Sequence, residues 1–427
     1  MKLDFFAPNT ADLLAKHKIS LTVEEAKDIQ TQLGRPLTLT EAVIFGIQLS
    51  EHCSYKSSRN FLKSLPTTGE NVVLGPSEDA GIVKVFEEGG EKYCIAVGHE
   101  SHNHPSQIVP YEGAATGIGG IVRDILCMGA RPVGVLDQLR LGNPEQNLQK
   151  NIATGVVQGI EGYGNPLGVP NLGGDAYFDS GFDENCLVNV TAFGVLRESD
   201  LIHSFVPQNA AEEKWDLILI GKPTDNSGFG GASFASGSFE EDDDLESKKA
   251  AVQEPNPFLE RHLIASTLDL FKKLKENGDY EKIAFKDLGA GGVLCATVEI
   301  CEPAGFGAEV NLDNLHTVGD YPPHVFACSE TQERFCFGCH PDMTQYILDH
   351  YNKTWELGKV AENAGASLVG KVRADGQYIV TMNGEVLCDA PASLITEGIL
   401  YDRPYTLPTI KEKKTNVSFI DGEICFN

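Results

Sequence analysis

Polar and ionisable side chains are concentrated between residues 98 and 105, where the sequence reads Gly-His-Glu-Ser-His-Asn-His-Pro. Three imidazoles, a carboxylate and a carboxamide stand beside a proline that is expected to stop any helix from continuing. This density of polar groups between apolar segments is costly to bury unless they meet a ligand, a metal or one another. We therefore interpret the segment as part of an active site and not as core.

Three carboxylates, those of Glu100, Asp124 and Asp287, lie in different glycine-rich settings and have no obvious basic partner one helical turn away. Separated carboxylates suit a hard cation such as Mg²⁺, which prefers oxygen ligands and usually keeps phosphate as a further ligand. Taken singly, each also fits a turn or a helix cap, where acidic residues are common. A magnesium site is predicted if the three side chains converge.

His102 and His104 are two residues apart, which on a strand places both side chains on one face. The pair fits a metal site, a base with its orienting partner, or two hydrogen-bonded histidines. Zinc is disfavoured because the sequence has no HExxH motif and no clear Cys/His quartet. Cys336 and Cys339 have CxxC spacing, but residues 333–337 alternate as a strand does, which favours a structural role.

Nucleotide binding would need an unusual phosphate site, because no Walker A motif is present. Residues 117–120, Gly-Ile-Gly-Gly, are predicted to open a helix that continues to Met128. Backbone N–H groups at such a helix start can bind phosphate, although glycine-rich turns are frequent.

The composition excludes several function classes. The 427 residues predict two or three domains. Thirty-four basic against 61 acidic residues give a net charge of −27, which excludes a nucleic-acid surface because phosphates would be repelled. No apolar stretch approaches a membrane span or a signal peptide. Eleven cysteines at irregular spacing suit free thiols in a reducing cytoplasm.

Helical patterns near the N-terminus indicate how the first polar residues are positioned. Residues 22–25 and 38–41 both read as capping boxes. The first predicted helix ends at Gly34, and the second runs through residues 42–49 and stops near His52. A loop is therefore expected to carry His52, Tyr55 and Lys56.

Further along, strand-like runs alternate with helical ones from Val72 to about Gly194, with strands predicted at residues 82–86, 93–97 and 188–194. A second α/β unit begins with a strand at 215–221 that leads into a Gly/Ser-rich loop. Apolar residues then recur at helical spacing from Ile264 to Leu274, and Gly278 closes that helix. The acidic run 240–244 is interpreted as a solvated loop.

Several motifs follow one another in order, at residues 49–58, 99–106, 112–124, 127–132, 231–236, 251–253, 287–292 and 329–334. Together they closely resemble the large subunit of phosphoribosylformylglycinamidine synthase. The resemblance extends from about residue 45 to residue 405. An ordered set of long motifs is far more specific than any one of them.

The resemblance implies the mixed α/β (α+β) fold of the aminoimidazole ribonucleotide synthetase superfamily. In that fold a half-barrel domain pairs with a partner module into a β-barrel and is followed by a second α/β domain. Pairing buries sheet edges that one module leaves open. The expected parts are a helical segment at 1–65, the barrel-forming domain with the catalytic motifs at 66–200, the C-terminal domain at 201–405 and an extended tail at 406–427.

The implied reaction belongs to purine biosynthesis. ATP activates the amide oxygen of formylglycinamide ribonucleotide as an iminophosphate, and ammonia from glutamine then displaces phosphate to give the amidine. Such chemistry needs cations on the phosphates and a base that manages protons as ammonia attacks. The implied cofactors are ATP and Mg²⁺.

The family's functional residues carry over position by position. His52 and His102 match the active-site histidines, with His102 as the proton acceptor, and Tyr55 matches an ATP contact. The implied magnesium ligands are Glu100, Asp124 and Asp287. The implied substrate contacts are Ser101, His102, Asn103, His104, Arg123, Gln253, Glu330, Thr331 and Gln332. Chemically, Arg123 suits a ribonucleotide phosphate and Gln253 suits amide or hydroxyl groups.

Two features depart from the family pattern. The family usually has an ATP-contacting Lys two residues before the metal-binding Glu, where this chain has Gly98, so Lys56 or Lys84 is a candidate replacement. The family's single-chain form also carries two copies of the two-domain module, whereas the motifs here end after the first, at residues 401–404. Further ATP and magnesium contacts normally come from the second copy.

The leading hypothesis is therefore a split synthase, in which this polypeptide works with a second-half chain, a glutaminase and a small subunit. One alternative is a homodimeric, self-pairing ATP-dependent kinase or synthetase of the same superfamily. Another is a non-catalytic nucleotide-binding module, which Gly98 and the missing half favour and the retained His, Glu and Asp residues oppose.

Overall fold

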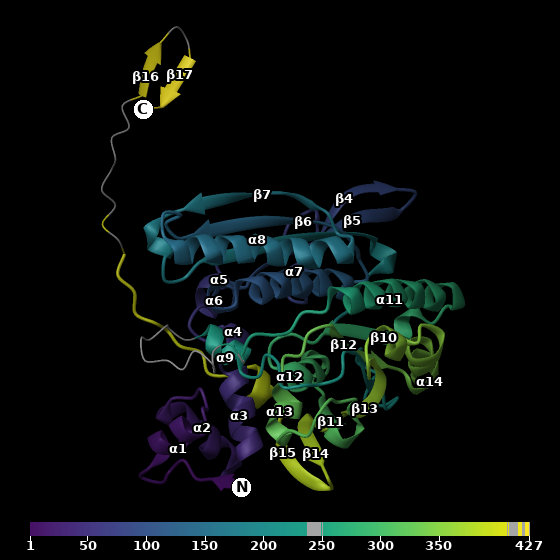
Figure 1. Ribbon diagram of the computed structural model, residues 1–427. Coiled ribbons are helices and arrows are strands. Elements are labelled where there is room, and N and C mark those ends of the chain that lie inside the picture. Colours follow the sequence, from purple (N-terminus) through teal and green to yellow (C-terminus); the bar gives the residue numbers. More distant parts are fainter. Residues whose placement is uncertain (237–248, 250, 408, 410–416, 421–422, 427) are drawn as a thin grey trace.

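Two β-sheets with helices packed between them form the body of the molecule (Figure 1). The computed structural model describes residues 1–427 except 237–248, 250, 408, 410–416, 421–422 and 427. The acidic run predicted as a solvated loop at 240–244 lies outside the described residues. No helix of the described part is long and apolar enough to cross a membrane.

The N-terminal segment is helical, as predicted. It contains the paired strands β1 (Lys2–Leu3) and β2 (Leu37–Thr38) and the helices α1 (Thr10–Lys16), α2 (Val23–Leu33), α3 (Leu39–Gln48), α4 (Glu51–Ser54) and α5 (Arg59–Leu62). Both capping boxes are confirmed: the Thr22 and Thr38 hydroxyls accept from the backbone N–H groups of Glu25 and Glu41, whose carboxylates accept in return. The predicted stop at Gly34 is also confirmed, with φ +66°.

This segment is part of a larger core. Nearly every side chain of α3 is buried, and its apolar residues belong to one cluster with those of the second sheet. The segment therefore positions His52 and Tyr55, which follow α3 directly, against the C-terminal part of the chain.

The first sheet has six strands in the order β3-β4-β5-β8-β6-β7. Their bounds are β3 (Val72–Leu74), β4 (Gly81–Glu88), β5 (Glu91–Ser101), β6 (Arg131–Leu141), β7 (Asn171–Phe178) and β8 (Leu187–Arg197). Neighbouring strands are antiparallel except β6 and β7, which are parallel. The predicted strands at 82–86, 93–97 and 188–194 are confirmed within β4, β5 and β8, whereas β6 and β7 were missed.

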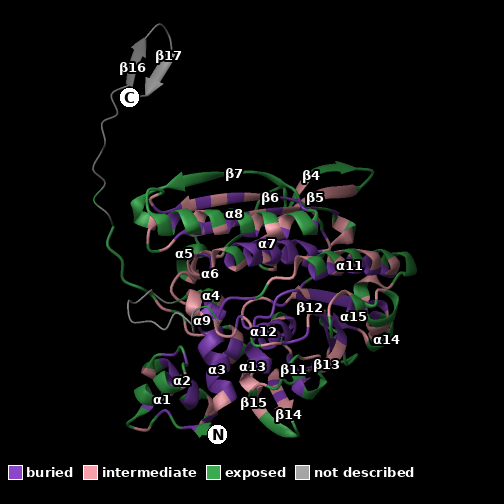
Figure 2. Cartoon of the chain, in the orientation of Figure 1, coloured by how far each residue is buried: buried purple, intermediate pink, exposed green. Residues whose placement is uncertain are grey.

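Within the described residues, helices cover one face of this sheet. Side chains that alternate along β5 and β8, such as Ala96 and Ala192, pack against α7 (Pro110–Cys127), and α8 (Asn147–Leu167) lies beside α7. The opposite face carries Val83, Ile95 and Val195, which are in register across three strands. β7 is exposed along its whole length, as the outer surface in Figure 2 shows.

The second sheet has seven strands in the order β10-β12-β9-β13-β11-β14-β15. Their bounds are β9 (Asp216–Gly221), β10 (Ile283–Asp287), β11 (Gly307–Asn311), β12 (Arg334–Cys339), β13 (Gly365–Arg373), β14 (Gln377–Met382) and β15 (Glu385–Pro391). β9 and β12 are buried along their whole length. Their alternate side chains enter two different apolar clusters, so both faces of this sheet are covered.

The helices of the second domain are α9 (Gly231–Ala235), α11 (Pro257–Asn277), α12 (Gly292–Glu299), α13 (Pro323–Cys328), α14 (Pro341–Asp349), α15 (Leu357–Val360) and α16 (Ala392–Thr396). α11 ends at Gly278 with φ +78°, as the sequence predicted. The strand predicted at 333–337 is confirmed in β12, and Cys336 and Cys339 are free, buried thiols in it.

Three expectations about local structure were wrong. Pro105 does not stop a helix, because it lies in the first turn of α6 (Asn103–Ile108), where its missing N–H is tolerated. α7 begins at Pro110, seven residues before the predicted start, so residues 117–120 lie inside the helix and offer no free helix N-terminus. The tail is not simply extended, since β16 (Val417–Ile420) and β17 (Glu423–Phe426) pair as an antiparallel hairpin.

Candidate active site

One cavity of about 520 Å³ collects most of the predicted site residues. Its lining comes from the N-terminal segment, from the end of β5 with α6 and α7, and from the loops and helices of the second domain. All predicted catalytic, cofactor and metal residues line it, together with the predicted substrate contacts except Thr331. Residues more than 200 positions apart in sequence thus surround one space.

His52 and His102 both line the cavity and interact electrostatically. His52 lies in the short helix α4 and not on a loop as expected, because Ser50 caps that helix, and its backbone N–H donates to Ser236 Oγ at 3.0 Å. His102 precedes α6, so it and His104 do not share a strand face. Burial lowers the pKa of both His52 and His102, that of His102 to about 4.

The His102 ring has a defined tautomer. Nδ1 lies 2.5 Å from the carbonyl oxygen of Gly113, which can only accept, so Nδ1 carries the proton and Nε2 keeps its lone pair. Two glycines of α7 make this approach possible. A Cβ on Gly117 would lie 3.2 Å from the His102 Cβ, and one on Gly113 would lie 2.4 Å from the Ser106 nitrogen.

The three predicted metal carboxylates face the same cavity. Burial raises the pKa of Asp124 well above its ordinary value, and the charges of Glu100 and Asp287 raise it further. Burial raises the pKa of Asp287 to about 7, although Arg123, 3.9 Å away, opposes this. Within the described residues no three His, Cys, Asp or Glu side chains are grouped tightly enough to hold a metal by themselves. The carboxylates of Glu100 and Asp287 repel that of Asp124, and the charges of Arg123 and Lys286 offset part of the effect on Asp287.

Arg123 is buried and largely occupied by protein partners. Its side chain is 1% exposed, donates to Gln332 Oε1 at 2.6 Å and lies 3.4 Å from Glu260. Its Nε has no hydrogen-bond partner, and neither does Gln253 Oε1 on the same cavity. Buried polar atoms without partners are rare in folded proteins, so these two indicate where a polar ligand fits.

Glu330 organises its surroundings. Its Oε1 accepts from the Ala232 and Gly291 backbone N–H groups, and its Oε2 accepts from Gln253 Nε2 at 2.8 Å. Thr331 points elsewhere, since its hydroxyl donates to Asp225 Oδ1 at 2.7 Å and its side chain does not line the cavity.

The remaining predicted contacts come from two places on the rim. Ser101 and His104 line the cavity with Asn103, whose Oδ1 accepts from the Val188 backbone N–H at 2.8 Å and so ties the segment to β8. Tyr55 lies across the site with a half-exposed ring and a left-handed backbone, φ +52°.

Sequence reasoning missed a second charged cluster in the cavity. Lys286 Nζ lies 2.8 Å from Asp79 and 3.2 Å from Glu299. The position of Lys286 directly before Asp287 is the sequence feature that could have identified it. The expected replacements for a lysine at position 98 lie outside the lining: Lys56 pairs with Glu25 and Lys84 with Glu87. Gly98 itself faces α7, where a Cβ would lie 2.6 Å from Ile121.

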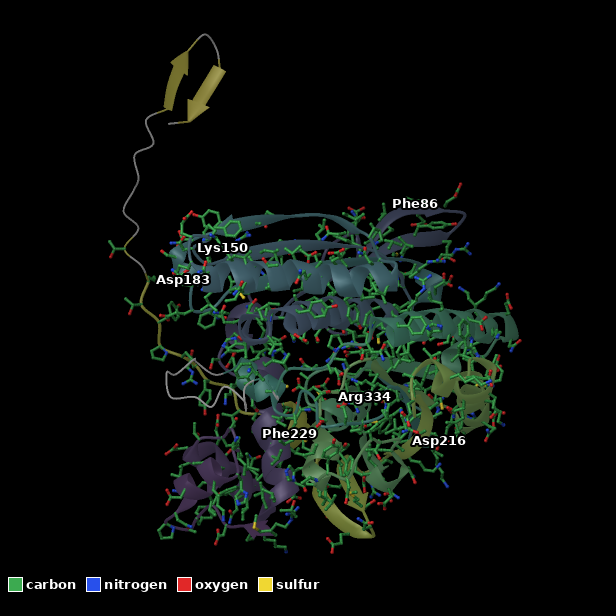
Figure 3. The ribbon with its side chains drawn as sticks, in the orientation of Figure 1. Phe86, Lys150, Asp183, Asp216, Phe229 and Arg334 are labelled. Carbon is green, nitrogen blue, oxygen red and sulfur yellow. The ribbon has the colours of Figure 1, made fainter. Side chains whose placement is uncertain are left out.

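The second domain positions its contribution through buried side chains. Arg334, labelled in Figure 3, donates from Nε to the Thr331 carbonyl at 2.8 Å and from Nη2 to the Ser329 carbonyl at 2.6 Å. These bonds fix the segment at 329–334, in which Glu333 has a left-handed backbone at φ +54°. The segment is therefore rigid where it meets the cavity.

Comparison with known proteins gives matches over most of the chain. Residues 77–196 match the AIR synthase related protein N-terminal domain, residues 216–371 match its C-terminal domain, and residues 11–56 match the formylglycinamide ribonucleotide amidotransferase linker domain. The first match covers most of the first sheet, the second covers most of the second sheet, and the third lies in the helical N-terminal segment.

Two relatives carry the same protein name. Phosphoribosylformylglycinamidine synthase subunit PurL of Methanothrix thermoacetophila is 49% identical over 91% of this chain and 50% of its own length, and that of Thermococcus kodakarensis is 42% identical over 93% and 53%. The chain thus spans about half the length of the relatives it matches.

Solved structures show the same relationship. T. maritima PurL complexed with FGAR is 33% identical, with a TM-score of 0.76 over 92% of this chain and 59% of that one. T. maritima PurL complexed with ATP is 30% identical, with a TM-score of 0.73 over 95% and 59%. With both domains matched in order and in fold, the chain belongs to the AIR synthase related family, in the branch of the PurL synthase subunits.

Proposed function

We propose that this chain forms the first half of an ATP-dependent, amidine-forming C–N ligase that acts on formylglycinamide ribonucleotide in purine biosynthesis. One observation carries the proposal: His102, Glu100, Asp124 and Asp287 line one cavity together with the predicted substrate contacts. The similar structures of T. maritima PurL complexed with FGAR and with ATP support the same substrates.

His102 is suited to accept a proton as ammonia attacks the activated amide. Its pKa near 4 keeps the ring neutral at neutral pH, and the hydrogen bond from Nδ1 leaves Nε2 as the basic atom. His52 supplies a second neutral imidazole in the cavity lining, where it suits contact with the substrate or the leaving phosphate.

Mg²⁺ fits the donor set of Glu100, Asp124 and Asp287. All three offer oxygen ligands to one cavity. Burial is the main cause of the raised pKa values of Asp124 and Asp287, neighbouring carboxylates add to it, and a bound cation would stabilise the charged forms. When bound, the ion would neutralise charge on the phosphates during phosphoryl transfer. Because these carboxylates alone do not form a three-ligand group, the phosphates are expected to complete the coordination.

Polar atoms without partners mark the substrate side. Gln253 Oε1 can accept from an amide or hydroxyl, and Arg123 Nε can donate to an anionic or carbonyl oxygen. The half-exposed ring of Tyr55 is available to a nucleotide base. Thr331 would act indirectly, by holding the segment through Asp225.

A second module is needed to complete the site, either in a partner chain or in a longer form of this chain. The uncovered face of the first sheet offers an apolar surface, with Val195 and Val83 exposed by 47% and 41%. A glutaminase that supplies ammonia and a small subunit complete the proposed complex, for which a structure of PurLQS from Thermotoga maritima is the precedent. The ten free cysteines of the described residues suit a reducing cytoplasm.

His102→Asn tests the catalytic assignment in the assembled enzyme. It should lower turnover with ammonia by about two to four orders of magnitude, the usual contribution of a positioned proton-transfer group, and change substrate affinity far less. Near-normal turnover at saturating ammonia would exclude the role.

Asp124→Asn tests the metal assignment. Calorimetric titration with Mg–ATP should show loss of the magnesium-dependent part of nucleotide binding, while the circular dichroism spectrum stays unchanged. Equal affinity of the variant and the parent protein would contradict it.

A further inference from the structure

Lys286 is the cation of the active-site cavity that the proposed reaction leaves without a role. It lies at the end of β10, and its side chain is 15% exposed. Its ammonium donates to Asp79 Oδ1 and lies 3.2 Å from a Glu299 oxygen, and all three residues line the cavity. Two carboxylates therefore hold the ammonium inside the space where the substrates react.

The charge balance of the lining shows why this ammonium matters. Seven carboxylates line the cavity: Glu78, Asp79, Glu100, Asp124, Asp287, Glu299 and Glu330. Among the described residues only Arg123 and Lys286 supply lysine or arginine cations there. Arg123 is engaged by Gln332 and Glu260. Of these two cations, the Lys286 side chain is the more exposed, at 15% against 1% for Arg123.

The contacts of Lys286 leave it able to bind a further anion. An ammonium has three N–H donors, and the hydrogen bond to Asp79 uses one. The other oxygen of that carboxylate, Oδ2, is buried and has no hydrogen-bond partner. Such an oxygen only accepts hydrogen bonds or meets a cation, so it fits a cation that accompanies a polyphosphate and not the phosphate oxygens themselves.

We propose that Lys286 binds the polyphosphate of the nucleotide, with Asp79 holding its ammonium in position and Glu299 competing with the polyphosphate for it. This inference rests on the proposed function and deepens it by naming a phosphate contact. We assign the polyphosphate, and not the monophosphate of the ribonucleotide, because Lys286 directly precedes Asp287, one of the carboxylates that would share Mg²⁺ with the phosphates of ATP.

The test uses the full chain and two probes that separate the phosphate sources, magnesium tripolyphosphate and ribose 5-phosphate. Lys286→Met should weaken calorimetric binding of magnesium tripolyphosphate by about 10- to 100-fold, the usual effect of a lost charged hydrogen bond, and leave ribose 5-phosphate unaffected. Lys286→Arg should retain most of the affinity, because it keeps the charge.

Lys56→Met is the matched control. Lys56 is 13% exposed and pairs with the buried Glu25 at 2.7 Å, outside the cavity. It should cost a comparable amount of stability and leave the affinity for magnesium tripolyphosphate unchanged. An equal loss of affinity in Lys286→Met and Lys56→Met would mean that the loss of any buried ion pair weakens binding. That result would contradict the proposal.

Glu299→Gln provides a second readout with the opposite sign, also usable if Lys286→Met does not fold. Removing a carboxylate that competes for the ammonium should tighten magnesium tripolyphosphate binding by about twofold to fivefold. A merely structural cluster would show weaker or unchanged binding in this variant.

The outcomes separate this proposal from the proposed function. Unchanged tripolyphosphate affinity in Lys286→Met, selective loss of ribose 5-phosphate, or no tripolyphosphate binding by the parent chain would each overturn it. Turnover of formylglycinamide ribonucleotide with an unchanged Lys286→Met affinity would contradict only the role of Lys286. Loss of affinity in Lys286→Met without any such turnover would support Lys286 and contradict only the proposed reaction.

Discussion

The two sheets of this molecule are built from similar apolar strands, yet they differ in how many faces they bury. In the second sheet β9 and β12 are buried along their whole length, and their alternate side chains serve two separate clusters. In the first sheet β5 and β8 alternate between buried and partly exposed residues, and α7 packs against both strands on one face. The second sheet is therefore packed on both faces, whereas the first is packed on one face.

This difference locates the site as well as the proposed interface. α7 packs against the covered face of the first sheet, and its C-terminal residues Leu126 and Cys127 join the apolar cluster of the second. Arg123 and Asp124 lie on the same helix, one turn earlier. These two residues of the cavity lining are therefore anchored between the two sheets, and the uncovered face remains available on the far side of the first one.

A charge on the uncovered face should have the largest effect. Val195→Asp places a carboxylate in the middle of the apolar row with Ile95 and Val83. In the assembled enzyme we expect at least a 100-fold loss of activity, because a buried unpaired charge costs several kcal/mol at an interface. Val386→Asp is the control, since Val386 is 55% exposed on the second sheet. Equal activity losses would contradict a specific interface on the first sheet.

Replacing one aromatic residue by alanine in each sheet should lower the free energy of unfolding by different amounts. Phe337 is fully buried and its ring centroid lies 4.3 Å from that of Phe285, so Phe337→Ala should destabilise the chain by about 3–5 kcal/mol. Phe86, labelled in Figure 3, stacks on Tyr93 at 4.5 Å but is 50% exposed. Phe86→Ala should cost about 1 kcal/mol or less. Urea unfolding of both variants gives the comparison, and similar losses would mean that the first sheet is as well covered as the second.

The sequence predicted what is decided locally. The capping boxes at Thr22 and Thr38 and the stop at Gly34 need only neighbouring residues, and all three were predicted correctly. The start of α7 was misplaced because the glycines at 113 and 117 read as a loop, whereas they serve close packing against α6 and His102.

The residues of the candidate site likewise divide into those that a local motif predicts and those that only the tertiary fold brings together. Motifs gave Glu100, Asp124 and Asp287, but Asp79, Lys286 and Glu299 meet only through the approach of β10 and α12 to the loop before β4. No pattern of neighbouring residues in the sequence predicts that these elements come together. The side-chain direction of Thr331 likewise depends on Asp225, which is 106 residues away.

A smaller effect concerns the covered face of the first sheet. Burial raises the pKa of Asp137 to about 6, and its Oδ1 has no hydrogen-bond partner. Because the folded state favours the protonated form, stability should fall as pH rises from about 4 through 6 and stay lower above that. Asp137→Asn should remove this dependence and stabilise the chain near neutral pH by up to about 2–3 kcal/mol.

Urea unfolding at pH 4.5 and pH 8 checks this sign. The control is Asp175→Asn, since the hydrogen bond from Arg140 lowers the pKa of that exposed carboxyl and its effect should be slight and opposite. A parent protein that is more stable at pH 8 than at pH 4.5, with Asp137→Asn unchanged from it, would refute the assignment.

Phosphate release that depends on both formylglycinamide ribonucleotide and ammonia tests the central claim most directly. It should be measured for this chain alone and after adding the half of the Methanothrix thermoacetophila PurL subunit that this chain does not match. The chain alone should release phosphate slowly or not at all, and the added half should raise the rate at least 100-fold while burying the uncovered face, an effect that Val195→Asp should cancel. Full activity of the purified chain by itself, as a monomer or as a homodimer, would contradict the account.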